Sequence, residues 1–218
     1  MVGAVKGLFF WGNGGRMDTH KEGGTVNERC VDERKATQAA AYFLGKTKRH
    51  HIPDYIILAK LMYFADRQAL LDLGHTITKG QHYSLEEGPI VSEVNDLLRG
   101  GEHPNRYKST GPWTEHISCT HIDGVRLLKD PGTDMLGKHE IEVLEAVYEK
   151  HGWKNKEQIE QTAHDLPEHL PPKEKDGCKE ITYTWLLHAA GINRAAAIKI
   201  VTDNEIKDSV RSLFASTK

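Results

Sequence analysis

The sequence predicts a mainly α protein: a single helical domain around a buried central helix, residues 54–73, with a small antiparallel β ribbon. Three observations support this prediction. A chain of 218 residues has the length of one domain, or of one domain with a tail. Apolar residues recur at helical spacing in most segments. Patterns typical of strands are confined to two short stretches.

The predicted central helix, 54–73, is apolar around most of its circumference. Its apolar residues cover one broad face and extend around both flanks: Ile57, Leu58, Leu61, Met62, Tyr63, Phe64, Ala65, Ala69, Leu70 and Leu71. A helix of this kind belongs in the middle of a fold, where several neighbours cover it. Pro53 suits the start of the helix, and Gly74 suits its end.

Further helices are expected on both sides of this segment. Spacing and capping residues indicate helices at 35–44, between a cap at Ser92 and an end at Gly100-Gly101, at 138–151, at 156–165, and two or three within 182–214. The last group is expected to divide near Gly191 and near Asp203. Asn155 and Gln158 are placed for reciprocal capping contacts at the start of the 156–165 helix.

Two stretches predict extended structure. Residues 76–86 contain the turn residues Lys79-Gly80, which favours a short hairpin or an extended excursion. Gly88-Pro89 is then expected to break any regular element. Residues 115–129 alternate weakly around Asp123-Gly124, and this dipeptide is a hairpin signal, so a small antiparallel ribbon is predicted here.

Residues 1–30 differ from the rest of the chain. Gly12-Asn13-Gly14-Gly15 lies in a polar stretch without periodicity, which predicts a disordered leader ahead of a folded domain over 31–218. The run Gly7-Leu8-Phe9-Phe10-Trp11 is too short for the core of a signal peptide. Met17 is an alternative start of the protein.

Composition limits the partners and the compartment. The formal net charge is −2, so no large field of one sign favours non-specific binding to nucleic acid or to acidic membranes. No apolar run approaches the ~20 residues that span a bilayer. Cys30, Cys119 and Cys178 are odd in number and far apart, which favours a reducing compartment over a disulfide framework. The sequence therefore predicts a cytoplasmic protein.

No constellation of residues predicts an enzyme. His139-Glu140 begins a zinc-protease pattern, but Val143 stands where the second histidine of that pattern would lie. There is no Gly-x-Ser-x-Gly elbow, and no glycine-rich loop is followed by Lys-Ser or Lys-Thr. No catalytic residue, metal site or cofactor is predicted, so a binding protein is expected.

The helices predicted at 138–151 and 156–165 allow two readings. They are joined by a turn containing Gly152, and such a pair can place its second helix in the major groove of DNA. That second helix is acidic, however, and affinity for DNA depends on cationic contacts with phosphates. An ordinary helical hairpin is therefore favoured, with a DNA-binding regulator as an alternative.

Three charged residues interrupt the apolar helix 54–73. Lys60, Asp66 and Arg67 cannot lie unpaired in a core, because desolvating a lone charge costs several kcal/mol. One interpretation is a structural polar network with the loops around 76–91. The other is that Arg67 and its neighbours line a groove that receives a partner.

Two blocks of sequence in this region resemble a known family. The first is Leu58-Ala59-Lys60-Leu61-Met62-Tyr63-Phe64-Ala65-Asp66-Arg67, followed by Leu70 and Gly74. The second is Ile77-Thr78-Lys79-Gly80, then Tyr83, then Glu87-Gly88-Pro89-Ile90-Val91. Together they resemble the Panacea domain of SocA-like antitoxins, and Thr162-Ala163-His164 is similar to a weaker motif of that domain. The usual tryptophan after this histidine is missing in Pro167-Glu168-His169-Leu170.

This resemblance implies an antitoxin of bacterial or phage-associated origin that neutralises a protein toxin by direct binding in a toxin-antitoxin system. The toxin is expected to be encoded by an adjacent gene, and no catalytic residue is carried over. Tyr63, Arg67 and Tyr83 are the predicted partner-binding residues, and Lys60 and Asp66 the predicted structural polar network. The alternatives are a proteolytic adaptor that delivers a bound protein to a protease, and a DNA-binding regulator.

Overall fold

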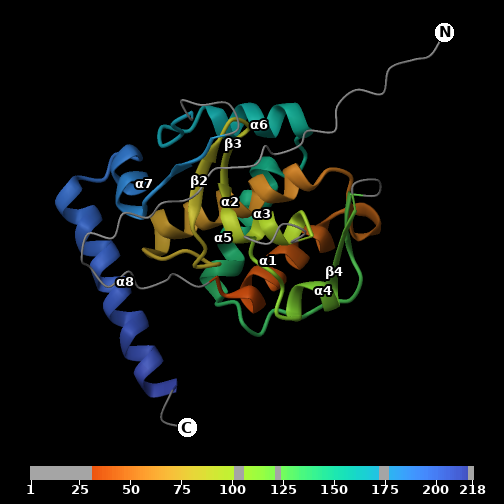
Figure 1. Ribbon diagram of the computed structural model, residues 1–218, viewed down its shortest axis with the longest axis horizontal. Coiled ribbons are helices and arrows are strands. Elements are labelled where there is room, and N and C mark those ends of the chain that lie inside the picture. The colour runs from red at the N-terminus through yellow and green to blue at the C-terminus, as the bar shows by residue number, and fades with distance from the viewer. Residues whose placement is uncertain (1–30, 101–105, 121–123, 172–176, 216–218) are drawn as a thin grey trace.

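The computed structural model describes residues 31–100, 106–120, 124–171 and 177–215, and Figure 1 shows their arrangement. The predicted leader, 1–30, lies outside the described residues. The elements in chain order are α1 (Glu33–Lys46), η1 (Lys48–His50), β1 (His51–Ile52), α2 (Tyr55–Leu73), β2 (His82–Leu85), β3 (Gly88–Val91), α3 (Ser92–Leu98), α4 (Pro112–His116), β4 (Ile117–Thr120), β5 (Gly124–Leu127), α5 (Lys138–His151), α6 (Lys156–His164), β6 (Lys179–Glu180), α7 (Tyr183–Ala189) and α8 (Arg194–Ala215). The predicted mainly α fold with a small antiparallel β component is confirmed.

Helix α2 occupies the centre of the fold (Figure 1) and packs against α1, α3, α5, α6 and α7. Asp54 caps its first turn by accepting a hydrogen bond from the backbone N–H of Ile56. Gly74 ends it in the left-handed conformation, at φ 77°, and donates its N–H to the carbonyl of Leu70. Residues through the middle of α2 are buried on every side, as an almost wholly apolar helix requires.

Helix α1 presents a face of small residues to the core: Ala36, Ala39 and Ala40 are fully buried. At its first turn, the Glu33 carboxylate accepts hydrogen bonds from the following loop, including the backbone N–H groups of Thr110 and Trp113. This anchors α4, a short helix that the sequence analysis did not predict. Trp113 of α4 is 2% exposed, so it completes the core beside α1.

Two three-stranded antiparallel sheets flank the helices, in the orders β3-β2-β6 and β1-β5-β4. The ribbon predicted within 115–129 is β4 paired with β5. The prediction that Gly88-Pro89 breaks regular structure is wrong, because these residues begin β3, which pairs with β2 from Gly88 to Val91. Pro89 is tolerated because β3 lies at the edge of its sheet, where a missing N–H leaves no neighbouring strand unpaired.

Helices α5 and α6 form as predicted, but each packs against α2 and the two are not among the pairs of elements that pack closely on each other, so the predicted hairpin is not a packed one. Asn155 and Gln158 make both contacts of the capping box that starts α6. Gly191, at φ 96°, separates α7 from α8 as predicted. The predicted division near Asp203 is wrong, because α8 runs unbroken through it. The segment contains no glycine or proline, and the Asn204 side chain, which donates to the Gly74 carbonyl, fixes the middle of the helix to the end of α2.

Candidate functional site

Lys60, Asp66 and Arg67 of α2 bond to segments that return over the helix. The Asp66 carboxylate is fully buried and accepts hydrogen bonds from the backbone N–H groups of Ile77 and Thr78, each 2.9 Å long, and from the Thr78 hydroxyl. A carboxylate that accepts two backbone N–H groups replaces the water that those groups lose on burial. Asp66 therefore holds the chain after Gly74 against α2.

His82 of β2 joins the buried residues around Asp66 to α7. Its Nε2 lies 3.4 Å from Oδ2 of Asp66, and its ring packs at 5.2 Å against the rings of both Tyr63 and Tyr183. Its Nδ1 has no hydrogen-bond partner within the described part of the chain. The Tyr183 hydroxyl donates to the Gly80 carbonyl, so the cluster links α2, the turn before β2 and α7.

Glu168, in the segment after α6, is the second buried carboxylate of the region. It accepts a 2.6 Å hydrogen bond from Arg67 Nε, a 3.3 Å bond from Arg67 Nη2, and a 3.1 Å bond from the Tyr63 hydroxyl. Burial first, and then the charge of Glu168, raises the pKa of Tyr63 well above its usual value, so its hydroxyl stays protonated and donates. Trp185 of α7 donates its indole N–H to the Glu168 carbonyl.

Lys60 is 1% exposed and points towards β3, where its Nζ donates to the Pro89 carbonyl at 3.1 Å. Burial lowers the pKa of this amine to about 8, and the charges of Glu87 and Glu160 oppose part of that shift. The amine therefore stays largely protonated at neutral pH. Its position secures β3 to α2 at the proline that carries no N–H of its own.

Strand β3 also meets α6 closely. An added Cβ at Gly88 would lie 2.9 Å from Cδ2 of His164 and 3.2 Å from Cβ of Ala163, so only glycine fits there. His164 in turn stacks on His169, with the ring planes 4° apart and the centroids 5.0 Å apart. The motif Thr162-Ala163-His164 thus supplies the surface on which β3 rests.

One hydroxyl–imidazole pair resembles part of a hydrolytic site but is enclosed. The Ser84 Oγ lies 2.7 Å from Nδ1 of His169 and accepts a second hydrogen bond from the Leu170 N–H. Ser84 is fully buried, so a substrate cannot reach its oxygen. Among the described residues, no three histidine, cysteine, aspartate or glutamate side chains come close enough to share a metal ion. No helix in the described ranges is long and apolar enough to cross a membrane.

The five residues singled out in the sequence differ in their exposure. Lys60, Tyr63 and Asp66 are buried, whereas Arg67 keeps 17% of its side chain exposed beside Glu168. Tyr83 of β2 is half-buried and directs its hydroxyl to the Gln81 side chain at 3.4 Å. The assignment of Tyr63, Arg67 and Tyr83 to partner binding stays a prediction, and only the last two have accessible surface for it.

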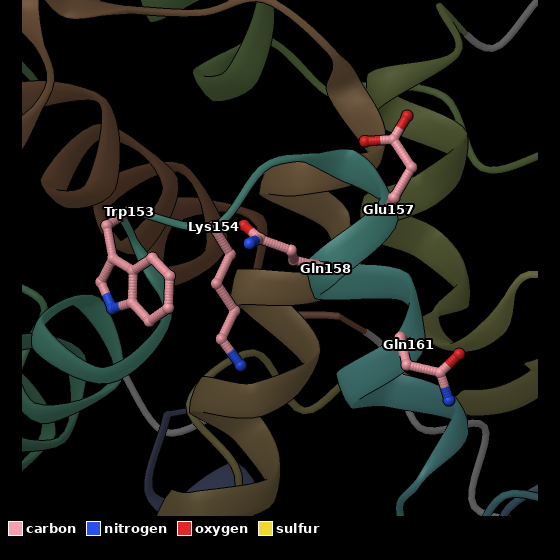
Figure 2. Close-up of a pocket in the computed structure, with 5 residues that line it drawn as sticks. All are labelled: Trp153, Lys154, Glu157, Gln158 and Gln161. Carbon is pink, nitrogen blue, oxygen red and sulfur yellow. The ribbon is translucent and has the colours of Figure 1, made fainter.

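A separate surface feature lies at the turn between α5 and α6. Trp153 is 69% exposed, and Figure 2 shows Lys154 between its indole and the side chains of α6. A shallow hollow of about 430 Å³ lies here, lined by Trp153, Lys154, Glu157, Gln158 and Gln161. The sequence predicted only a turn containing Gly152 here. A large aromatic residue among polar neighbours was the signal that would have identified it.

These features define a helical domain whose signature polar residues hold its own elements together. The chain belongs to the antitoxin SocA-like, Panacea domain family, whose model matches residues 58–168. The match runs from α2 to Glu168 and leaves α1, α7 and α8 outside it. Neither a curated protein nor a solved structure matches the chain.

Proposed function

We propose that this protein is an antitoxin that neutralises a protein toxin by binding it directly, and that the toxin is encoded by an adjacent gene. The match to the antitoxin SocA-like, Panacea domain over 58–168 carries the proposal. The geometry is consistent with it, because Lys60, Asp66 and Arg67 of the signature helix are engaged in contacts within the domain itself. A binding protein needs a stable surface, which such a network supports, and no reactive centre.

The hollow beside Trp153 is the surface that we assign to the toxin. Tryptophan is enriched among the few residues that carry most of the energy of protein interfaces. Here the indole has Lys154 5.8 Å away over its ring and uncharged amides of Gln158 and Gln161 nearby, so it offers apolar contact with hydrogen-bonding groups at its rim. Arg67 and Tyr83 remain further candidates for contact.

DNA binding through α6 has less support. Lys156 pairs with Asp54 at 3.4 Å, and Lys154 donates to the Thr162 hydroxyl at 2.6 Å, so both cations nearest the helix are already engaged. The outward side chains of α6 are otherwise acidic or uncharged, including Glu157 and Gln161. A surface of this charge attracts phosphates weakly.

Co-expression with the product of the adjacent gene tests the proposal. That product should arrest growth alone and lose its toxicity when this protein is present, and the two should elute together from a size-exclusion column. A neighbouring product that is harmless alone, or that stays toxic beside this protein, overturns the proposal. A chase after protein synthesis is stopped separates the two modes of inhibition: the toxin persists if it is masked, and disappears if this protein delivers it to a protease.

A further inference from the structure

Helix α8 carries an apolar stripe along its exposed side. Five large apolar side chains, 45% to 74% exposed, form this stripe: Ile198, Ile206, Val210, Leu213 and Phe214. They are separated mainly by three, four or eight residues, so they gather on one side of the helix. Exposed apolar stripes of this kind mark contact surfaces, since an ordinary helix exposes polar residues there.

The opposite side of α8 is the one that holds it to the domain. Ala197 is fully buried, the Asn204 side chain donates to the Gly74 carbonyl, and Asp208 pairs with Lys79 at 2.7 Å. With 3.6 residues per turn, this docked side and the centre of the stripe are separated by about 170° around the helix axis. Figure 1 shows α8 along one edge of the molecule, so a second molecule can approach the stripe.

Two residues of opposite charge flank the stripe on one side. Asp203 and Lys207 are both exposed, and their spacing of four residues places them on the same flank. When two identical helices pack antiparallel about a twofold axis, each flank meets the same flank of the other copy. With the axis beside Glu205, Asp203 of each copy faces Lys207 of the other. The charge of this flank is therefore complementary to itself.

The same register also matches the apolar stripe with itself. Leu213 of one copy then lies opposite Ile198 of the other, and Ile206 lies close to its own symmetry mate. Lys199, at the amino-terminal end of the stripe, can lay its aliphatic stem along apolar surface while its amine stays in water. The apolar contacts and the two ion pairs thus require one and the same arrangement.

The stripe is large enough for a dimer interface. Five large side chains that are each about half exposed or more offer on the order of 500 Å² per copy. Two copies would bury about 1,000 Å², at the lower end of the range for specific interfaces. A dimer of this kind should dissociate on dilution.

We propose that α8 of one chain packs antiparallel on α8 of a second copy through this stripe, which forms a twofold dimer. The self-complementary flank favours a second copy over an unrelated protein, whose surface would not need to repeat this alternation of charge. The contact goes beyond the proposed function and does not depend on it, since no toxin takes part.

Sedimentation velocity of the full chain at several protein concentrations tests the dimer. The unmodified protein should pass from monomer to dimer as the concentration rises. Val210→Asp places a charge within the stripe and should raise the dissociation constant about 30-fold or more. Leu128→Asp makes the same kind of change at another exposed apolar residue, 58% accessible and located after β5, and should dimerise as the unmodified protein does.

Exchange of the two flanking charges tests the antiparallel arrangement. Asp203→Lys brings like charges together at both symmetry-related positions and should weaken dimerisation about 5-fold. The double variant D203K/K207D restores both pairs and should return the dissociation constant to its original value. A circular dichroism melt of each variant establishes that the domain is folded.

Three results would overturn the proposal. The first is a monomer at every concentration, and the second is a dimer that Val210→Asp leaves intact, because another surface would then form it. The third is equal weakening by Asp203→Lys and by D203K/K207D, which would show that these charges do not face each other across an antiparallel pair.

Discussion

Arg67 and Glu168 are 101 residues apart in the sequence, yet Nε of Arg67 donates to Oε1 of Glu168 over 2.6 Å. The carboxylate is fully buried, and the guanidinium reaches it from the edge of the core. This pair joins α2 to the segment after α6, and so joins the two ends of the region that matches the Panacea family. The pair thereby fixes the segment after α6 to the central helix.

Replacing Arg67 should show how much this pair contributes to the free energy of unfolding. Arg67→Ala leaves the buried Glu168 carboxylate with the Tyr63 hydroxyl as its remaining side-chain donor. Removing one partner of a buried ion pair costs about 3 kcal/mol, because the other charge stays desolvated. We therefore expect the free energy of unfolding, measured by urea titration, to fall by about that amount.

Lys138→Ala is the control for this measurement. Lys138 pairs with Glu142 across one turn of α5, at 3.8 Å, and both side chains are well exposed. Exposed pairs of this kind contribute little to stability, so no measurable change is expected. If Arg67→Ala lowers the free energy of unfolding by less than ~1 kcal/mol, the pair does not behave as a buried one, because a decrease of that size is typical of an exposed pair.

Gly88 should tolerate no side chain, for two separable reasons. Its φ is +93°, and an added Cβ would press on His164 and Ala163 of α6. Gly100 has a similar φ, +77°, but open space around its Cα. Both alanine substitutions carry backbone strain of about 1 kcal/mol or more, and Gly88→Ala adds the steric conflict. A lower melting temperature for Gly88→Ala than for Gly100→Ala is expected, and equal melting temperatures would show that β3 and α6 separate without cost.

Glu33 should make stability depend on pH in acid. Burial alone raises the pKa of this carboxyl, but hydrogen bonds from Ser109, Thr110 and Trp113 outweigh it and lower the pKa to about 2. A folded pKa below the unfolded value contributes stability that is complete above about pH 4.5 and is lost as the pH falls towards 2. In Glu33→Gln, the free energy of unfolding should be lower at pH 7 and should decline less between pH 4.5 and 2.

Glu157→Gln is the matched control for Glu33, because it neutralises an exposed carboxylate of α6 and leaves that network intact. It should retain the acid dependence of the unmodified protein. Urea titrations at several pH values provide the comparison. If the free energy of unfolding falls equally in acid for Glu33→Gln and Glu157→Gln, the hydrogen bonds to Glu33 are not the cause of the acid dependence.

His151 should make the free energy of unfolding depend on pH at higher pH values than Glu33 does. Burial first, and then the charges of Lys154 and Lys150, lower the pKa of this histidine to about 4, and its ring lies 4.6 Å from that of Phe64. Its unfolded form binds a proton near pH 6.5, so stability is complete above that value and is lost as the pH falls towards 4. His151→Phe should remove this loss. His139→Gln, at an exposed position of α5, should keep it, and the same loss in both variants would contradict the assignment.

Local patterns in the sequence were sufficient for most of the elements. The apolar circumference of α2 predicted its central position, and the capping residues Asn155 and Gln158 predicted the start of α6. The continuity of α8 was missed, because Asp203 resembles a local break and its neighbour Asn204 is held by Gly74, about 130 residues away. Contacts of that separation leave no periodic signal.

The polar network was predictable only in part. A charge within an apolar helix must find a partner, so the burial of Lys60 and Asp66 with compensating bonds follows from their position. The partner of Arg67 does not follow, since Glu168 lies in a segment without regular pattern and meets α2 only after the chain has folded. Trp153 stands out in the sequence only as a large aromatic residue among polar neighbours, and its exposure follows only once the neighbouring helices are in place.

Trp153 provides the most direct test of where the toxin binds. Trp153→Ala removes a side chain that is 69% exposed, so the melting temperature should stay unchanged. If the indole is an interface anchor, its loss should weaken binding of the co-expressed toxin by roughly 30-fold, the effect of about 2 kcal/mol. Leu128→Ala removes another large exposed apolar residue, 58% accessible and located just after β5, and should leave the affinity as it was. Titration calorimetry measures both variants. Equal affinities for the two would move the toxin-binding surface away from the α5–α6 turn and leave Arg67 and Tyr83 as the positions to substitute next.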